Sequence, residues 1–312
     1  MASSLSTPRL RTSTERRAPN PIVLWHLLSL DAPTVATLWT WFIARACHLR
    51  LPWESLAAMA FAVWILYAAD RLLDARILNA LPLAKHEELE PRHHFHHRHR
   101  PAFLAGIALC SLALTPLLLR LPAEALRLYL IEGALLVAWF LIIHISSGSR
   151  RLPKELAVGP FFAAATFIPT VSRLPAERPA LLAPAILFSA LCSLNCLYIY
   201  AWEHSGPKAK ARHPERSEGF LHFARSSGGN PHPTTRFALN LLPLLTPALA
   251  IAGALLATLE PAIWRLPAAC ALSALALLTL HRLRARLDPT ILRAAADLAL
   301  LTPLLLLLSH FG

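Results

Sequence analysis

Charged residues are scarce in this sequence: Asp, Glu, Lys and Arg make up 15% of 312 residues, whereas apolar residues make up 55%. A soluble domain of this length needs far fewer Leu and Ala residues to fill its core. The alternating pattern of a membrane β-barrel is also absent, and an open strand cannot cross lipid because its backbone groups would stay unsatisfied. The composition therefore predicts an all-α, polytopic membrane protein.

Several motifs that indicate other functions are also missing. The five cysteines form no CxxC pair and no spacing typical of a disulfide framework or zinc knuckle, so we interpret them as small buried residues. Residues 1–21 contain four arginines but no apolar core beside a cleavage site, which favours a cytosolic tail over a signal peptide. The net charge of +12 is not accompanied by an aromatic and basic binding module, so we expect no nucleic-acid partner.

Long apolar runs recur along the chain, and roughly 20 apolar residues cross a bilayer as a helix. Nine segments have this character: 31–48, 54–74, 101–120, 124–146, 155–173, 179–203, 236–257, 262–282 and 289–311. In this arrangement, 23 of the 30 Lys and Arg residues lie on one side of the membrane, in residues 1–21, 71–100, 150–154, 208–236 and 282–293. The positive-inside rule then predicts a cytosolic N-terminus and a nine-helix domain over residues 22–312.

A polar stretch at 204–235 interrupts this domain and is rich in Gly, Pro and Ser, which is typical of a long cytosolic loop. Its core, RHPERSEGFLHFARSSGG, resembles translated intergenic repeat DNA of the kind that inserts into bacterial genes. We therefore interpret this stretch as an insertion and expect the protein in a bacterial inner membrane.

Two carboxylates lie at the cytosolic end of the second predicted helix, in VWILYAADRLLDAR. Asp70 and Asp74 are spaced i,i+4, so they share one helix face. Oxygen ligands of this type suit Mg²⁺, which bridges to phosphate groups. The alternative is a pair of solvated carboxylates at a helix end, partnered by Arg71 and Arg76.

The sixth predicted helix ends with a third carboxylate. Asn195, Ile199 and Glu203 form a row at i, i+4 and i+8 on one face of that helix. By the predicted topology, Glu203 lies at the same depth as the aspartates of the second helix. The two acidic helix ends are expected to face one cavity, although a glutamate at this place can also be a simple boundary residue.

Two further aspartates lie in or beside apolar segments. Asp31 precedes Pro33 and the first long apolar run, which is typical of an N-cap with a structural role. Asp297 lies about two turns inside the last helix, where an ionisable residue is costly. We expect Asp297 to pair with an Arg or another polar neighbour.

Four stretches resemble, in order, the UbiA-type intramembrane prenyltransferase family. LSLDAP resembles the family's R-L-D-K-P entry to the first helix, and YAADRLLDA resembles the later part of N-D-x-x-D-x-x-x-D, with Asp70 and Asp74 on its last two aspartates. SRRLPKELAVGPFFAAATFIP resembles the basic loop and the start of the fifth helix, with Lys154 on the phosphate-side lysine. NCLYIYAWE resembles the second acidic motif, with Glu203 on its central acid. The likeness covers most of residues 29–311.

The same stretches depart from the family pattern at several positions. Leu66 and Tyr67 occupy the positions of the first motif's Asn and leading Asp. In the second motif Asn195 and Ile199 replace polar or acidic positions, and Pro207 stands where another Asp is usual. Three carboxylates remain where the family has more, so weaker Mg²⁺ binding is expected.

The resemblance implies a nine-helix bundle that transfers a prenyl group from a prenyl diphosphate to an aromatic or lipid-like hydrophobic acceptor. In this interpretation Asp70, Asp74 and Glu203 are the catalytic residues and hold Mg²⁺ against the diphosphate. The phosphates and substrate would be bound by Lys154, Arg71, Arg151, Asn195 and Arg100. A non-catalytic, lipid-binding relative with the same architecture is the alternative, because part of the acidic motifs is missing.

The stretch RHHFHHRHR, residues 92–100, follows the second predicted helix. Arg100 and Pro101 resemble the end of the family's arginine-containing segment, and arginines attract phosphates and anionic headgroups. We interpret the stretch as a basic interfacial lid, with ordinary positive-inside sequence as the alternative. A third hypothesis is a di-iron membrane oxidoreductase, because His93, His96 and His97 match an H-x-x-H-H box. Such sites need further histidine boxes, and the other histidines are scattered.

Overall fold

The structure, a computed structural model, describes residues 20–75, 91–145, 154–204 and 233–308. Within these ranges all regular elements are helices, which confirms the predicted all-α class for the described part of the chain. The main helices are α1 Pro21–Leu27, α2 Asp31–Ala46, α3 Trp53–Ala75, α5 Pro91–Arg98, α6 Arg100–Leu118, α7 Ala123–Ile145, α8 Lys154–Val171, α9 Arg178–His204, α11 Pro233–Leu259, α12 Arg265–Leu283, α13 Pro289–Leu298 and α14 Pro303–Leu308. The predicted N-terminal tail up to residue 19 and the polar loop at 205–232 lie outside the described residues.

Six stretches of the described chain are long and apolar enough to cross a membrane, and they lie in α3, α6, α9, α11, α12 and the joined pair α13 and α14. Helices α1 and α2 meet at 90°, and this bent pair adds a seventh stretch if it is counted as one span. Helix α8 is apolar but shorter. The described part of the chain is thus all-helical, with several apolar helices that fit an integral membrane protein.

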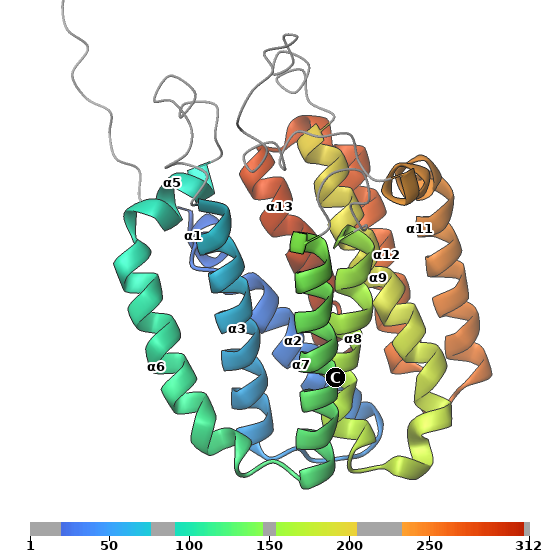
Figure 1. Cartoon of the computed structure of the whole chain (residues 1–312). Coiled ribbons are helices and arrows are strands. Elements are labelled where there is room, and N and C mark those ends of the chain that lie inside the picture. The colour runs from blue at the N-terminus through green and yellow to red at the C-terminus, as the bar shows by residue number, and fades with distance from the viewer. Residues whose placement is uncertain (1–19, 76–90, 146–153, 205–232, 309–312) are drawn as a thin grey trace, which may run out of the picture.

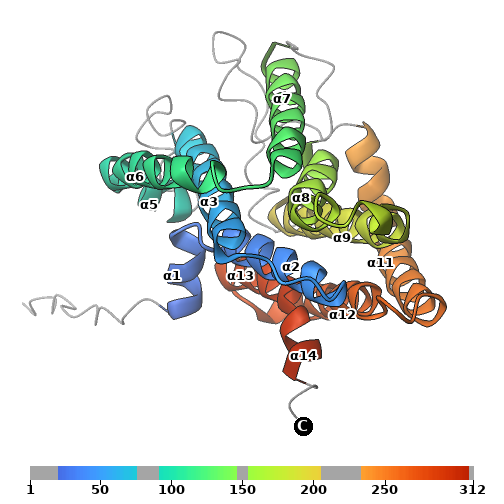
Figure 2. The same ribbon diagram turned by 90° about the horizontal axis from the view of Figure 1, so that it is seen from below.

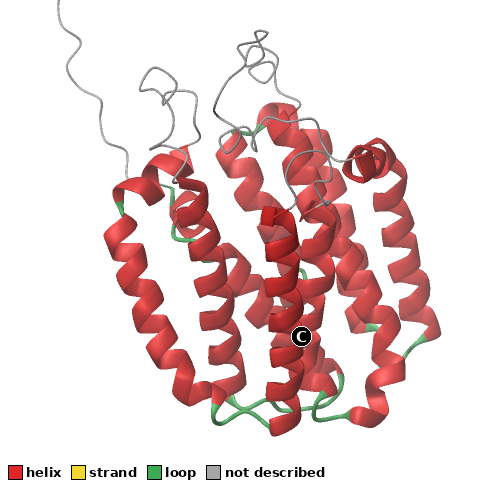
Figure 3. Ribbon diagram, viewed as in Figure 1, coloured by secondary structure: helices red, strands yellow, loops and turns green. Residues whose placement is uncertain are grey.

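The long helices run alternately up and down, so that they form a bundle with two distinct ends (Figures 1 and 3). One end, at the top of Figure 1, carries the last turns of α3, α7, α9 and α12 and the first turns of α6, α8, α11 and α13. We call it the basic end, because the stretches predicted to hold most Lys and Arg residues begin or end there. The view along the bundle shows α6 and α7 at its periphery, with α2 nearer the middle, between α3, α8 and α13 (Figure 2).

The main core lies where α2 packs against α8, α9, α12 and the C-terminal helices. Trp39 is its centre: its ring lies 4.2 Å from that of Phe188 between centroids, and its indole N–H donates to the carbonyl of Leu300 at 2.8 Å. A smaller cluster joins α3 to α6 through Trp64 and Phe103, whose rings are stacked at 6.2 Å. Many leucines on the outer faces of the helices are exposed, as lipid contact allows.

Two prolines lie inside α8, and each removes the amide N–H that would satisfy the carbonyl four residues earlier. Neighbouring helices supply the missing donors. The hydroxyl of Ser193 on α9 donates to the carbonyl of Leu156, which Pro160 leaves free, at 3.0 Å. The hydroxyl of Tyr129 on α7 donates, at 3.2 Å, to the carbonyl that Pro169 leaves free. In a membrane, where water cannot do this, such bonds tie α8 to both neighbours.

Helices α8 and α9 also approach closely at Gly159. A Cβ atom on this residue would lie 2.2 Å from the carbonyl oxygen of Ser189 and 2.2 Å from the hydroxyl of Ser193. Real Cβ atoms are never that close to a backbone oxygen, so the packing requires glycine here, as is common where membrane helices touch.

Candidate functional site

The predicted acidic pair lies on one continuous helix. Asp70 and Asp74 are both in α3, which ends at Ala75 at the basic end of the bundle (Figure 1). Their i,i+4 spacing gives them one helix face, as predicted. The side chain of Asp70 is exposed, and that of Asp74 lies outside the described atoms. Both backbone positions therefore lie within two turns of the basic end of the bundle.

The other predicted ligands also lie at helix ends. Glu203 is in the last turn of α9 and Lys154 begins α8, and both ends lie at the basic end of the bundle (Figure 1). Arg100 begins α6 at the same end and is exposed. The side chains of Glu203 and Lys154 and the whole of Arg151 lie outside the described part of the structure. The fold thus brings the four described helix ends to one side of the bundle.

Arg71, which we predicted to bind phosphate, lies in a buried ion pair. Its Nη2 donates to the Asp31 carboxylate at 3.4 Å and to the Tyr67 hydroxyl at 2.8 Å, and only 5% of the residue is exposed. Its guanidinium also lies 4.6 Å from the centroid of the Tyr67 ring. Asp31 is fully buried, and its Oδ2 lies 2.6 Å from Nδ1 of His26 on α1. These contacts connect α1, α2 and α3.

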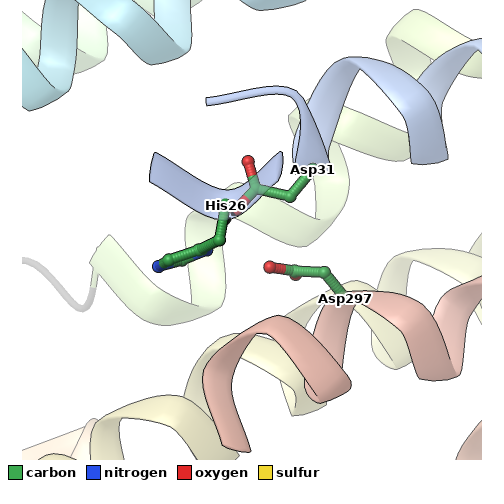
Figure 4. Close-up of side chains that lie close together, drawn as sticks. All are labelled: His26, Asp31 and Asp297. Carbon is green, nitrogen blue, oxygen red and sulfur yellow. Dashed lines mark hydrogen bonds and ion pairs between the residues drawn. The ribbon is translucent and has the colours of Figure 1, made fainter. Parts of the chain in front are cut away.

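Asn195 is the centre of a second buried contact. Its side-chain amide donates to Asp297 on α13 at 3.0 Å, and both residues are buried. Asp297 therefore has a polar neighbour, as we expected from the sequence, and the neighbour comes from α9. The two contacts meet, because ligand atoms of His26, Asp31 and Asp297 all lie within 4.8 Å of one another (Figure 4).

The group formed by His26, Asp31 and Asp297 is the one set of three described side chains that could hold a metal ion. Its surroundings favour an ion network instead. Arg71 already contacts the Asp31 oxygen that also contacts His26. Arg293, one turn before Asp297 on α13, is also buried. The Arg71 guanidinium already lies against Asp31, so a divalent ion would bring a second positive group into a site of low dielectric.

The role of Asp31 differs from our prediction in one respect. The N-cap of α2 is Leu30, and Asp31 is the first helical residue, whose Oδ1 accepts from the amide of Ala32 at 3.0 Å. The predicted N-cap is thus wrong, because the chain enters α2 from α1 through a sharp bend. Ser29 has a positive φ of 59° in that bend. This geometry turns the Asp31 side chain toward α1 and α3, and no periodic pattern in the sequence signals it.

The histidine-rich stretch forms helix α5 and the start of α6. His96 is 1% exposed, its Nε2 lies 3.2 Å from the hydroxyl of Ser29, and its ring lies 4.6 Å from that of Phe103. The other described basic side chains of this stretch are exposed: His94, His97, Arg98, His99 and Arg100. One histidine therefore anchors α5 to the bend between α1 and α2, and the remainder present a basic surface at the basic end.

Comparison with known proteins gives no family. In comparisons with protein-family models, curated proteins and solved structures, nothing matches this chain. Its function is therefore inferred from the residues and their arrangement.

Proposed function

We propose that this chain is an integral membrane prenyltransferase of the UbiA type, with nine spans, its N-terminus in the cytosol and its site at the cytosolic face of a bacterial inner membrane. The acceptor in this proposal is an aromatic or lipid-like molecule. The observation that carries the proposal is the common level of the acid-bearing helix ends: α3, with Asp70 and Asp74, and α9, with Glu203, both end at the basic end of the bundle.

The donor set of this end suits magnesium and a diphosphate. Carboxylate oxygens are the ligands that Mg²⁺ prefers, and the three carboxylates come from helix ends that phosphates can reach. Bound Mg²⁺ would offset the negative charge that develops on the leaving diphosphate. Asp70, Asp74 and Glu203 would hold the ion, while Lys154, Arg151 and Arg100 would bind phosphate oxygens. The apolar walls of the bundle would exclude water from the reacting prenyl carbon.

Transfer of a radiolabelled geranylgeranyl group to a lipid-soluble acceptor fraction, catalysed by purified protein with Mg²⁺, tests the proposal. The double variant Asp70→Asn and Asp74→Asn should lose at least about a hundredfold in rate, since it removes charge that acts on the transition state. Glu260→Gln is the matched control, because Glu260 is an exposed acid directly after α11, which ends at the opposite end of the bundle. Full activity in the double variant would refute the proposed role of the aspartates.

The second candidate is a non-catalytic, lipid-binding membrane protein of the same architecture. The internal bonds of Arg71 and Asn195 favour it, because these two side chains are committed to Asp31 and Asp297 and do not reach an open site. Titration of Mg²⁺ into the protein with geranylgeranyl diphosphate, followed by calorimetry, separates the two candidates. The enzyme needs Mg²⁺-dependent binding of the diphosphate, whereas the lipid-binding protein does not. The di-iron alternative gains no support, since His96 is buried against Ser29.

A further inference from the structure

A chain of four buried polar residues crosses the interior of the bundle. It runs from Arg71 on α3 to Asp31 on α2, then to Asp297 on α13 and to Asn195 on α9. We call these four residues the polar bridge. Its two outer members lie on the two helices that carry the proposed metal ligands, and its two inner members lie close together (Figure 4).

The bridge is costly for a membrane protein. All four residues are at most 9% exposed, and burying charged groups carries a desolvation penalty that ion pairing only partly offsets. Leu or Ala at the same places would pack without this penalty. Buried polar groups of this kind can specify one geometry among several, which apolar packing does less sharply.

The helical positions show what the bridge would specify on α3. Asp70 precedes Arg71 by one residue and Asp74 follows it by three, so both acids lie about 60–100° round the helix from Arg71, on the same side. Tyr67, one turn earlier on α3, orients the Arg71 guanidinium toward Asp31 on α2, so α3 cannot rotate without breaking the hydrogen bond between Arg71 and Asp31. The anchor therefore fixes the direction in which the acidic pair points.

The same reasoning applies to α9. Asn195 lies eight residues before Glu203, which is about 12 Å along the helix. Its bond to Asp297 holds α9 against α13, and ligand atoms of Asp297 and Asp31, the partner of Arg71 on α3, lie within 4.8 Å of each other. The separation of the two acid-bearing helices is thus set through the bridge.

We propose that Asp31 and Asp297 are positioning residues that hold α3 and α9 at the separation and rotation required by the acids at their ends. This inference rests on the proposed function, which gives the two helix ends their role. The coupling between the positions of α3 and α9 does not depend on any reaction. Neither aspartate touches substrate or metal in this proposal. They act through Arg71 and Asn195.

The distance between the two helix ends in the full chain tests the coupling. Spin labels on ketone-bearing unnatural residues at Leu73 on α3 and Leu283 on α12 leave the five native cysteines in place. Both positions are exposed, at 50% and 40%. The label on α12 reports on α9, because the indole N–H of Trp202 donates to Nδ1 of His281 at 3.1 Å.

Asp31→Asn and Asp297→Asn should each broaden and shift the distribution of this distance, measured by pulsed electron paramagnetic resonance. Ser273→Ala is the matched control: it breaks a buried 2.6 Å contact to Thr302 that is not part of the bridge, and should leave the distribution unchanged. Binding of Mn²⁺, used as the probe for Mg²⁺ with geranylgeranyl diphosphate present, should weaken by about 10- to 100-fold in the two bridge variants only.

The outcomes separate the two proposals. An unchanged distance distribution in folded Asp31→Asn and Asp297→Asn protein overturns the positioning role, whatever the metal does. A wild-type chain that binds no Mn²⁺ overturns the proposed function, whereas the distances still decide whether the bridge couples the helices. Equal loss of Mn²⁺ binding in Ser273→Ala would mean that general loosening of the fold, and not positioning, causes the effect, and would also overturn the inference.

Discussion

Breaking the buried pair of Arg71 and Asp31 should destabilise the protein more than removing both partners together. At the observed separation of 3.4 Å, Coulomb attraction at an effective dielectric constant near 20 gives a gross interaction of about 5 kcal/mol. Arg71→Met leaves Asp31, which is fully buried, without its guanidinium. The expected cost is about 3–5 kcal/mol, the range found when one charge of a buried pair is left alone.

The double variant Arg71→Met with Asp31→Leu removes the desolvation penalty along with the attraction. It should therefore recover most of the stability that the single variant loses, since apolar replacement of a buried pair is often close to neutral. His26 would also lose its partner in this double variant, so recovery should be incomplete.

Thermal unfolding in detergent, followed with a thiol-reactive fluorophore, measures these differences. Cys192 and Cys270 are buried and become reactive when the bundle opens. The midpoint for Arg71→Met should fall by roughly 5–15 °C, and that for the double variant by clearly less. A single variant as stable as the wild type would show that the pair carries no buried charge interaction. A double variant less stable than the sum of the two single changes would refute the charge argument in another way, because the losses would then come from packing.

Two further predictions concern the packing of the helices. Gly159→Ala should destabilise the protein or reduce its expression, because the new Cβ would lie 2.2 Å from a backbone oxygen of α9. The control is Gly133→Ala on α7, whose Cβ would meet nothing within 4 Å; it should be neutral or stabilising. Equal unfolding midpoints for the two variants would contradict the close approach. Trp39→Phe should cost about 1 kcal/mol or more by removing the indole donor of the Leu300 carbonyl, and the same thermal assay should detect it as a lower midpoint than in Trp53→Phe, which changes an exposed ring.

The helices themselves could be predicted from the sequence because their signal is local. The second predicted segment, 54–74, corresponds to α3 at Trp53–Ala75, and the eighth, 262–282, to α12 at Arg265–Leu283. A run of about 20 apolar residues indicates a membrane helix by itself, whatever segments pack against it in the fold. The expectation that Asp297 would have a polar neighbour was confirmed for a similar reason, since a buried ionisable group needs a partner wherever it lies.

The identity of the partners could not be predicted, because it depends on tertiary arrangement. Asn195 and Asp297 are separated by 102 positions, and Arg71 and Asp31 by 40. The contact between His26 and Asp31 further requires the 90° bend between α1 and α2, with Ser29 at positive φ. None of these features produces a recognisable periodic pattern in the sequence. The roles of Asp70, Asp74 and Glu203 as metal ligands stay predictions.

The two prolines of α8 have a consequence for the order in which the helices enter the membrane. The carbonyl of Leu156 accepts its hydrogen bond from Ser193 on α9, and that of Ala165 accepts from Tyr129 on α7. Two backbone carbonyls of α8 therefore stay without hydrogen bonds until both neighbouring helices are beside it. Tyr129 leaves the ribosome before α8, but Ser193 leaves after it. During synthesis α8 should therefore wait at the translocon, or at the surface of the bilayer, and enter the lipid together with α9 as one helical hairpin.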